Sequence, residues 1–296
     1  MELITDVERG AWLRDRAGGW ARVGGAAGTG FEAYARILHP VPATLEDLSV
    51  TDEWGMHPVL QESQWPWSAV ARRVGRTMHP LVQWNRVTRD VDDGTSFEDG
   101  WRVHQTTEGF FDLGLLATLT GHLADATSTP EDVVAAIWNG WGELGHHGWA
   151  YYREEGSGLQ GWWAQRRAQR EAEAERRVAL SPEVERMAKA GPFLEWPARD
   201  LVLFATSLPE LADPTWPERA GIGVLPGGGD ISPQLIWPAD HSWVVASEID
   251  WDSTIVAGSR SLVEAVIADE TFEAFEVDED ADLTYEGDTI NPPWDG

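Results

Sequence analysis

The sequence predicts a single α+β domain in which helices pack on an antiparallel or mixed sheet. Strand patterns occur at 31–41 and through much of 191–259, whereas 66–76 and 111–141 carry helical patterns. The chain has 296 residues, of which 42% are hydrophobic and 24% are charged. This composition is typical of a soluble globular protein with a substantial core. We expect residues 1–275 to form this one domain.

The first predicted strand is FEAYARILHPV (31–41), in which side chains of different character alternate. Phe31 and the three apolar residues at every second position share one face, and Glu32, Tyr34 and Arg36 share the other. This alternation predicts a half-buried strand, which the prolines at 40 and 42 end.

The later strands have stronger apolar patterns. RDLVLFATSL (199–208) is apolar on both faces, as expected of a central strand. PQLIWP (233–238) and SWVVASEI (242–249) flank a short polar turn and therefore predict a hairpin. STIVAGS (253–259) predicts a further strand of the same sheet.

Helix signals occur in four places. Residues 66–76 begin with a proline and end with basic side chains, and 110–126 place leucines at helical spacing. Within 127–141, Thr129 is a good N-cap for a helix, and proline and two acids follow it. Ser259 is placed to cap a last helix in RSLVEAVIAD.

Two segments lie outside the predicted core. Residues 161–190 are dominated by Arg and Glu, with pairs such as Arg167 and Glu171 four residues apart, so we expect a charged, solvent-exposed helical insertion. Residues 276–296 hold eight acidic and no basic side chains, which predicts a solvated acidic C-terminal tail.

The charge of the chain restricts its partners. Fifty acidic residues against 22 basic ones give a formal net charge of −28. Such a field repels phosphate backbones, so we expect no nucleic-acid binding, and it favours a basic protein as partner. The start, MELITDVERG, has no secretory signal pattern, and no apolar run is long enough to span a membrane, so we expect a cytoplasmic protein that does not bind membranes.

Standard cofactor and metal motifs are incomplete in this sequence. The absence of cysteine excludes disulfides, thiolate catalysis, zinc fingers and iron–sulfur clusters. GGAAGTG (24–30) lacks the Lys-Ser/Thr ending of a phosphate loop, and DVDDGTSFEDG (90–100) has glycine where a calcium ligand should stand. We therefore predict no cofactor and no metal.

The stretch 237–259 concentrates the candidate chemistry. If 242–249 is a strand, Glu248 and Asp250 share a face, and Asp252 extends it. Carboxylates so aligned could bind a divalent cation or act as an acid–base pair. No catalytic role is assigned to any one residue. The candidate binding residues are Trp237, Asp240, His241, Trp243, Glu248, Asp250 and Asp252.

A structural interpretation of the same stretch also holds. Asp250 and Asp252 are residue types that accept hydrogen bonds from backbone amides in turns. Trp237 and Trp243 would then pair across the hairpin as packing. On this interpretation the stretch is first a scaffold and second the wall of a pocket.

The chain resembles a group of uncharacterised proteins from high-GC bacteria. The resemblance is carried by GFEAYARILHP (30–40), TSTPEDVVAAIWNGWG (127–142) and SPQLIWPADHSWVVASEIDWDSTIVAGS (232–259). No activity is implied by it. It implies that the first strand and the 232–259 hairpin belong to one domain, from which 161–190 is an excursion.

Two functions stay open at this point. The first is a non-enzymatic module that binds another protein and neutralises or regulates a basic partner, as the charge and the 18 tryptophans suggest. The alternative is a metal-assisted hydrolase that uses Glu248, Asp250, Asp252 and His241, which requires these groups to converge in a pocket.

Overall fold

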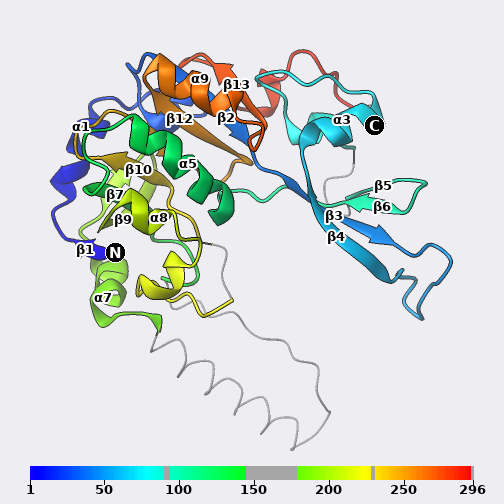
Figure 1. The fold of residues 1–296 in the computed structure, drawn as a ribbon, viewed down its shortest axis with the longest axis horizontal. Coiled ribbons are helices and arrows are strands. Elements are labelled where there is room, and N and C mark those ends of the chain that lie inside the picture. Colours follow the sequence, from blue (N-terminus) through cyan, green and yellow to red (C-terminus); the bar gives the residue numbers. More distant parts are fainter. Residues whose placement is uncertain (90–93, 145–178, 228–230, 295–296) are drawn as a thin grey trace, which may run out of the picture.

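The structure is a computed structural model that describes residues 1–89, 94–144, 179–227 and 231–294. Helices surround two antiparallel sheets in this part of the chain, so the predicted α+β class is confirmed (Figure 1). None of the helices in these ranges is long and apolar enough to cross a membrane.

The larger sheet has the strand order β1-β9-β7-β10-β11-β12-β2-β13, and β8 pairs with β9. Every neighbouring pair in it is antiparallel. The strands predicted at 199–208, 233–238, 242–249 and 253–259 are confirmed as β9, β10, β11 and β12. The strands are β1 (Glu2–Ile4), β2 (Ala33–Leu38), β7 (Val133–Trp138), β8 (Leu194–Trp196), β9 (Arg199–Thr206), β10 (Leu235–Pro238), β11 (Val244–Ala246), β12 (Ser253–Gly258) and β13 (Ala274–Val277).

A smaller sheet follows from the same first strand. β2 leaves the large sheet and, after His39 and Pro40, the chain enters β3 of a sheet with the order β4-β3-β6-β5. Trp67 and Trp84, from the two helices beside this sheet, belong to its own buried apolar cluster. Figure 1 shows β3 and β4 extending away from the large sheet as a long hairpin. The elements are β3 (Val41–Glu46), β4 (Val59–Trp65), α3 (Trp67–Val74), α4 (Trp84–Val87), β5 (Thr95–Ser96) and β6 (Trp101–Val103).

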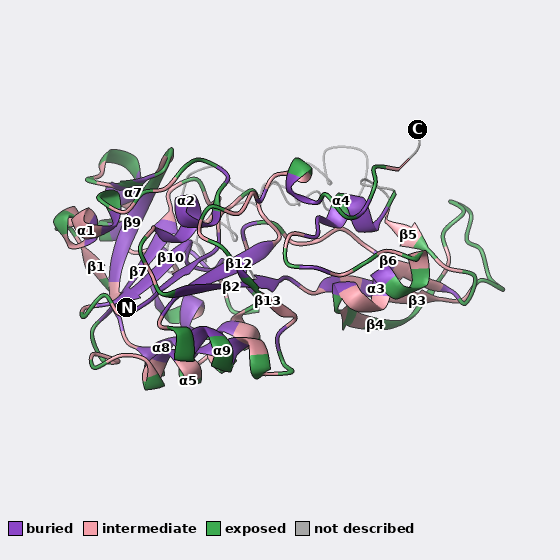
Figure 2. Ribbon diagram, turned by 90° about the horizontal axis from the view of Figure 1, so that it is seen from above, coloured by how far each residue is buried: buried purple, intermediate pink, exposed green. Residues whose placement is uncertain are grey.

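Helices cover both faces of the large sheet. α5, α8 and α9 lie on one side and α2 on the other (Figure 2). Leu119 and Val263 are in the apolar cluster of the first side, with Met187 of α7, and Leu13 and Ala27 are in that of the second. These helices are α1 (Ala11–Arg14), α2 (Val23–Ala27), α5 (Leu113–Asp125), α7 (Pro182–Ala190), α8 (Leu208–Leu211) and α9 (Arg260–Ala268), with 3-10 turns at Val7–Gly10, Trp216–Arg219 and Tyr285–Gly287.

The helix ends follow their capping residues. Asp112 caps α5 by accepting hydrogen bonds from the amides of Gly114 and Leu115. Ser259 caps α9 through the amide of Leu262, as predicted. The helices predicted at 66–76 and 110–126 are confirmed as α3 and α5.

The helix predicted over 127–141 is wrong, because residues 133–138 form the strand β7 between β9 and β10. Its first five residues, VVAAI, are buried, which suits a central strand better than an amphipathic helix. The capping signal at Thr129 forms a turn instead, in which the Thr129 carbonyl accepts from the amide of Asp132 at 3.1 Å. Tertiary burial overrides the local helix signal.

The half-buried character predicted for 31–41 is also wrong. All six residues of β2 are buried, including Tyr34 and Arg36 on the face expected to be polar. The Tyr34 hydroxyl donates to the carbonyl of Gly28, and the polar atoms of Arg36 find partners within the protein. Polar side chains are tolerated on a buried face when their hydrogen bonds are made.

The solvated tail predicted at 276–296 is wrong for the described residues, which pack on the domain. β13 pairs with β2, and Asp288 is buried with its carboxylate accepting hydrogen bonds from His79, Gln83 and Asn291. The number of acidic residues in 276–296 does not predict this arrangement. A carboxylate can be buried where several N–H donors converge on it.

Most of the predicted 161–190 insertion lies outside the described residues. Its described end is α7, which Ser181 caps through the amide of Val184. The helical state predicted for these residues is confirmed. α7 nonetheless packs on the core through Val184, Met187 and Ala188, so this part is not a wholly exposed helix.

Candidate functional site

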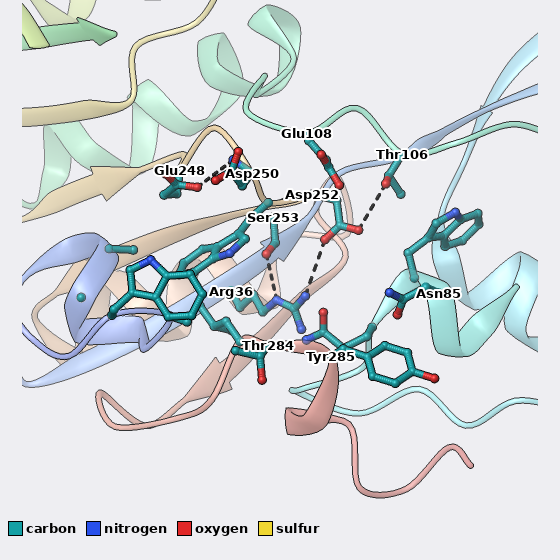
Figure 3. Close-up of a pocket in the computed structure, with 18 of the residues that line it drawn as sticks. Arg36, Asn85, Thr106, Glu108, Glu248, Asp250, Asp252, Ser253, Thr284 and Tyr285 are labelled. Carbon is teal, nitrogen blue, oxygen red and sulfur yellow. Dashed lines mark hydrogen bonds and ion pairs between the residues drawn. The ribbon is translucent and has the colours of Figure 1, made fainter. Parts of the chain in front are cut away.

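A cavity of about 420 Å³ lies where the large sheet meets the segment that leads into α5 and the C-terminal segment. Its charged lining is two arginines and four carboxylates: Arg36, Arg199, Glu108, Glu248, Asp250 and Asp252. Figure 3 shows Arg36 and the four acids around one space, with Thr106 beside Asp252 and with Thr284 and Tyr285 close to Arg36. These residues are widely separated in the sequence, so the fold alone assembles the site.

Arg36, on β2, forms the buried floor of the cavity. Its Nε donates to the Ser253 hydroxyl at 2.9 Å, and Nη1 donates to the carbonyls of Val82 at 2.8 Å and Pro80 at 3.1 Å. Its side chain is 1% exposed, and burial lowers the pKa of Arg36 to about 10. The guanidinium therefore stays charged at neutral pH and anchors the groups around it.

Asp252 faces this guanidinium at 3.8 Å and accepts a hydrogen bond from the Thr106 hydroxyl at 3.2 Å. Burial raises the pKa of Asp252, although Arg36 and Thr106 oppose the shift. Arg36 thus positions the Asp252 carboxylate on the cavity floor, but its charge does not fully offset the effect of burial on the pKa of that carboxylate.

Glu108 stands at the exposed mouth of the cavity, on the segment that links β6 to α5. Partial burial raises its pKa first, and the negative charges of Asp252, Asp250 and Glu248 raise it further. The next residue, Gly109, has a φ of +70°, and a Cβ there would lie 2.7 Å from backbone atoms of Ile249. Only glycine allows this close approach, which brings Glu108 to the other acids.

Arg199 holds the two remaining acids together. Its Nε donates to Glu248 at 3.0 Å, its Nη2 is ion-paired with Asp250, and the Asp250 amide donates to Glu248 at 2.7 Å. These acids raise the pKa of Arg199 in spite of its partial burial. Glu248 and Asp250 therefore have a cationic partner, whereas Glu108 has no ion pair with a basic side chain in the described part of the chain.

Two residues with unusual backbone conformation line the cavity. Among the described residues, Ala21, Ala198 and His241 are the non-glycine positions with positive φ, and the first two belong to the lining. Ala198 has a φ of +61° after Pro197, in the two-residue turn that precedes Arg199. Such strain tends to occur at functional sites, where the surrounding structure maintains it.

Aromatic side chains form much of the remaining wall, which includes Trp20, Trp84, Trp251 and Tyr285. Trp20 is 80% exposed at the mouth, whereas Trp84 is buried and its indole N–H has no hydrogen-bond partner. Buried indole N–H groups are usually satisfied. The lining therefore offers flat aromatic surface, whereas the indole N–H of Trp84 is buried out of reach of a ligand.

A chain of buried hydrogen bonds anchors this end of the sheet. His39 Nδ1 donates to the Thr107 carbonyl at 2.9 Å, His39 Nε2 accepts from the Thr254 hydroxyl at 2.9 Å, and the Thr254 and Ser247 hydroxyls are 2.7 Å apart. Burial lowers the pKa of His39 to about 4, so the ring is neutral at pH 7. The chain holds the segment with Glu108 against the strands that flank Asp252.

The five polar residues of the predicted site separate into two groups. Glu248, Asp250 and Asp252 line the cavity. Asp240 and His241 lie in the turn at the opposite end of β11. Burial alone would raise the pKa of Asp240, but hydrogen bonds from Ser128, Ser242 and Thr127 outweigh it and lower that pKa.

His241 does not approach the acids. Its ring stacks on Trp12, with centroids 4.0 Å apart. Burial, followed by the charge of Arg16, lowers its pKa. The hydrolase hypothesis needed His241 among the carboxylates, and the structure does not bring it there.

The two predicted tryptophans do not pair with each other. Trp237 belongs to the apolar cluster on one face of the large sheet and Trp243 to the cluster on the other. Trp243 donates its indole N–H to the Leu123 carbonyl at 3.1 Å. Both side chains are buried, so they stabilise the core, and the predicted cross-hairpin pairing is wrong.

Sequence reasoning missed Arg36, Glu108 and Arg199. A charged residue inside AYARIL was the available signal for Arg36, since a buried arginine in a strand needs partners. Glu108 and Arg199 carried no local signal of this kind, because their role depends on long-range contacts.

A metal-binding arrangement of acids and histidines is absent from the described residues, the acids of the cavity included. In residues 1–89, 94–144, 179–227 and 231–294 no three His, Asp or Glu side chains are arranged to hold a metal ion. In comparisons with known proteins, the chain matches no protein-family model, no curated protein and no solved structure. Any function must therefore be argued from the site itself.

Proposed function

We propose that the chain is a binding module for a basic protein, and that its cavity receives a cationic side chain, Arg or Lys, of that partner. The observation that carries the proposal is the charge balance of the lining, in which four carboxylates face two arginines. Arg36 and Arg199 hold three of the acids, and Glu108 is the acid that neither contacts. The remaining negative charge favours a cation in the cavity.

The raised pKa of Glu108 supports this assignment. Its neighbouring acids make the negative form of Glu108 unfavourable, and either a proton or a bound cation relieves that repulsion. A cation in the cavity lowers the pKa of Glu108, so binding releases protons. The affinity consequently rises with pH until Glu108 is ionised in the free protein.

The aromatic walls suit the same ligand. A guanidinium or ammonium group binds favourably over the face of Trp or Tyr. Trp20, Trp84, Trp251 and Tyr285 line the cavity, and Trp20 is exposed where a ligand would enter. Acidic groups beside aromatic surface are the usual surroundings of bound cationic side chains.

The test is calorimetric titration of the protein with argininamide over a range of pH. We expect binding that strengthens as pH rises and weakens with salt. Glu108→Gln should lower the affinity about fivefold, corresponding to ~1 kcal/mol for a partly exposed ion pair. It should also flatten the pH dependence.

The matched control is Glu195→Gln. Glu195 is an exposed acid on β8 outside the cavity, so this variant should bind as the native protein does. Absence of argininamide binding, or equal affinity of the two variants, would contradict the proposal.

A second candidate function is acid–base hydrolysis, which one observation favours. The raised pKa of Glu108 makes it a better proton donor near neutral pH than an ordinary glutamate. Asp250, ion-paired with Arg199, is available as the base. Glu108 would protonate the leaving oxygen of a glycoside while Asp250 takes a proton from the attacking water. This candidate replaces metal assistance, for which no ligand arrangement was found in the described residues.

Nitrophenyl glycosides test this second candidate. Turnover with a bell-shaped pH profile that Glu108→Gln and Asp250→Asn each abolish would support hydrolysis over binding. No turnover above that of Glu108→Gln with any of these substrates would remove hydrolysis of glycosides and leave the binding proposal.

A further inference from the structure

The hairpin formed by β3 and β4 carries most of the large hydrophobic side chains that are exposed in the described chain. Eight large hydrophobic side chains are exposed among the described residues, and six of them lie in residues 46–62, which we name the arm. The other two are Trp20 and Ile290. The six are Leu48 (50% exposed), Val50 (48%), Trp54 (80%), Met56 (55%), Val59 (51%) and Leu60 (63%). Exposed apolar side chains concentrated in this way mark interaction sites.

The loop that presents these side chains is ordered by its own hydrogen bonds. Asp52 accepts from the amides of Trp54 at 2.9 Å and Met56 at 2.8 Å, and its own amide donates to the Met56 carbonyl at 2.9 Å. Asp47 accepts from the amide and hydroxyl of Ser49. The side chains are therefore held outward in a formed loop, which reduces the entropy lost on binding.

β4 also leaves one edge of its sheet free. It is the end strand of the order β4-β3-β6-β5 and pairs with β3 alone. No backbone hydrogen bond joins β4 to any other element in the part of the chain that the structure describes. Natural edge strands are commonly protected by lysine, proline or a bulge. VLQESQW contains neither lysine nor proline, and its one irregularity is at Leu60, which the register skips between Val59 and Gln61, so the edge is regular from Gln61 to Trp65.

The charge of the arm selects the partner. Residues 46–62 contain five acidic side chains and no lysine or arginine: Glu46, Asp47, Asp52, Glu53 and Glu62. We propose that the free edge of β4 receives an extended segment of a partner protein in which basic and apolar residues alternate. Its backbone would extend the small sheet, its basic side chains would lie on the face of β4 that carries Glu62, and its apolar ones would lie on the opposite face, beside Trp65. Where the segment runs past β4, it would reach Trp54 in the loop of the arm.

A second copy of this chain is a poor occupant of the same edge. Glu62 is the central residue of β4, so antiparallel pairing of two β4 strands about their centres would place two copies of it close together. Each arm would also bring five acids and no basic residue to the contact. Like charges in such an interface oppose association.

The probe is a short synthetic peptide of alternating lysine and valine, mixed with the whole protein and followed by hydrogen exchange and calorimetry. Strand addition should slow exchange at alternate amides of β4, whose N–H groups point away from β3. Peptides of lysine with serine and of glutamate with valine should give no protection, because each lacks one of the two required properties.

Two exposed apolar side chains provide a matched pair of variants. Trp54→Ala should weaken peptide binding about tenfold, as expected of an aromatic contact in the interface. Ile290→Ala removes another exposed apolar side chain, which lies outside both the arm and the cavity lining, and should leave the protection of β4 by the peptide unchanged. Neither side chain is buried, so both variants should fold.

Three results would overturn the proposal: no protection in β4, equal protection by the lysine–serine peptide, or a concentration-dependent dimer that Trp54→Ala dissolves. The last would assign the edge to a second copy. The inference stands apart from the cavity, since loss of binding in Trp20→Ala or Glu108→Gln with Trp54→Ala unaffected would assign the peptide to the cavity instead. The arm and the cavity can therefore fail separately.

Discussion

The two turns that flank β11 are both acidic, but they use their carboxylates differently. In the first turn Asp240 accepts hydrogen bonds from Ser128 and Thr127, and His241 stacks on Trp12. In the second, Glu248, Asp250 and Asp252 line the cavity together with Glu108, which comes from another segment. Asp240 has hydrogen-bond donors close to it. The acids of the cavity, in contrast, outnumber the arginines beside them.

The difference shows that acidic residues in a turn do not by themselves indicate a binding site. The hydrogen-bond donors around each carboxylate must also be known. Hydrogen-bond donors lower the pKa of Asp240, whereas partial burial, followed by the charges of neighbouring acids, raises the pKa of Glu108. A carboxylate whose negative form is stabilised by hydrogen-bond donors of the protein has a structural role. A carboxylate whose negative form is destabilised by burial and neighbouring acids remains available to a ligand. The predictions below test whether the two turns divide in this way.

The largest expected effect is on stability, at Asp252. Asp252→Ala leaves the buried Arg36 without its carboxylate, so the free energy of unfolding should fall by about 3 kcal/mol. Urea denaturation measures it. Asp250→Ala in the same turn is the control, because the Asp250 side chain is 69% exposed and its removal should cost about 0.5 kcal/mol or less. Equal losses in the two variants would show that Arg36 does not depend on Asp252.

A fall in pH should destabilise the protein through the buried His39, which lies at the cavity end of the large sheet. The pKa of His39 is lowered from 6.5 to about 4, so its neutral form is required in the folded state. The unfolding free energy should be constant above about pH 6.5 and fall by ~3 kcal/mol as the pH drops to 4, at 1.36 kcal/mol per pKa unit. Denaturation at successive pH values measures this slope. His39→Gln should largely remove it, and an unchanged slope in that variant would contradict the assignment.

A smaller loss of stability is expected at Asp240. Asp240→Ala removes an acceptor shared by Ser128 and Thr127, and the loss should be about 1 kcal/mol because the site is exposed. Urea denaturation measures the loss of unfolding free energy in this variant, and argininamide titration measures its affinity for the cation. The variant should bind argininamide as the native protein does, and weaker binding would mean that this turn also serves the cavity.

The smallest effect is expected in the backbone of the cavity wall. Ala198 holds a φ of +61°, which glycine adopts without strain. Ala198→Gly should stabilise the protein by about 0.5 kcal/mol, since relief of strain exceeds the added entropy of the unfolded chain. Thermal denaturation checks the sign. A loss of stability would indicate that the turn is unstrained.

Much of the large sheet could be predicted from local patterns. The hairpin of β10 and β11, the strand β12 and the Ser259 cap follow from alternation, turn residues and capping chemistry, which are properties of neighbouring residues. β7 could not be predicted, because its cap-like start and its buried VVAAI run favour different structures, and only the neighbouring strands decide between them.

The site was predictable only in part. Alternation placed Glu248 and Asp250 on one face, and turn proximity added Asp252. Arg36 and Glu108 reach these acids across more than a hundred residues of sequence, as Arg36 does in bonding Ser253 over a separation of 217. No periodicity or spacing contains that information. The buried C-terminal segment was missed for the same reason, since Asp288 is stabilised by donors more than two hundred residues away.

The ionisation of Glu108 decides whether the cavity is built for a cation, and carboxyl NMR of the protein labelled at glutamate measures it directly. The Glu108 signal can be assigned by its loss in Glu108→Gln. Our account predicts that the pKa of Glu108 lies above the ordinary glutamate value in the free protein and falls when argininamide is added. A Glu108 that titrates at the ordinary value, or whose pKa argininamide leaves unchanged, would contradict the claim that this cavity is built for a cation.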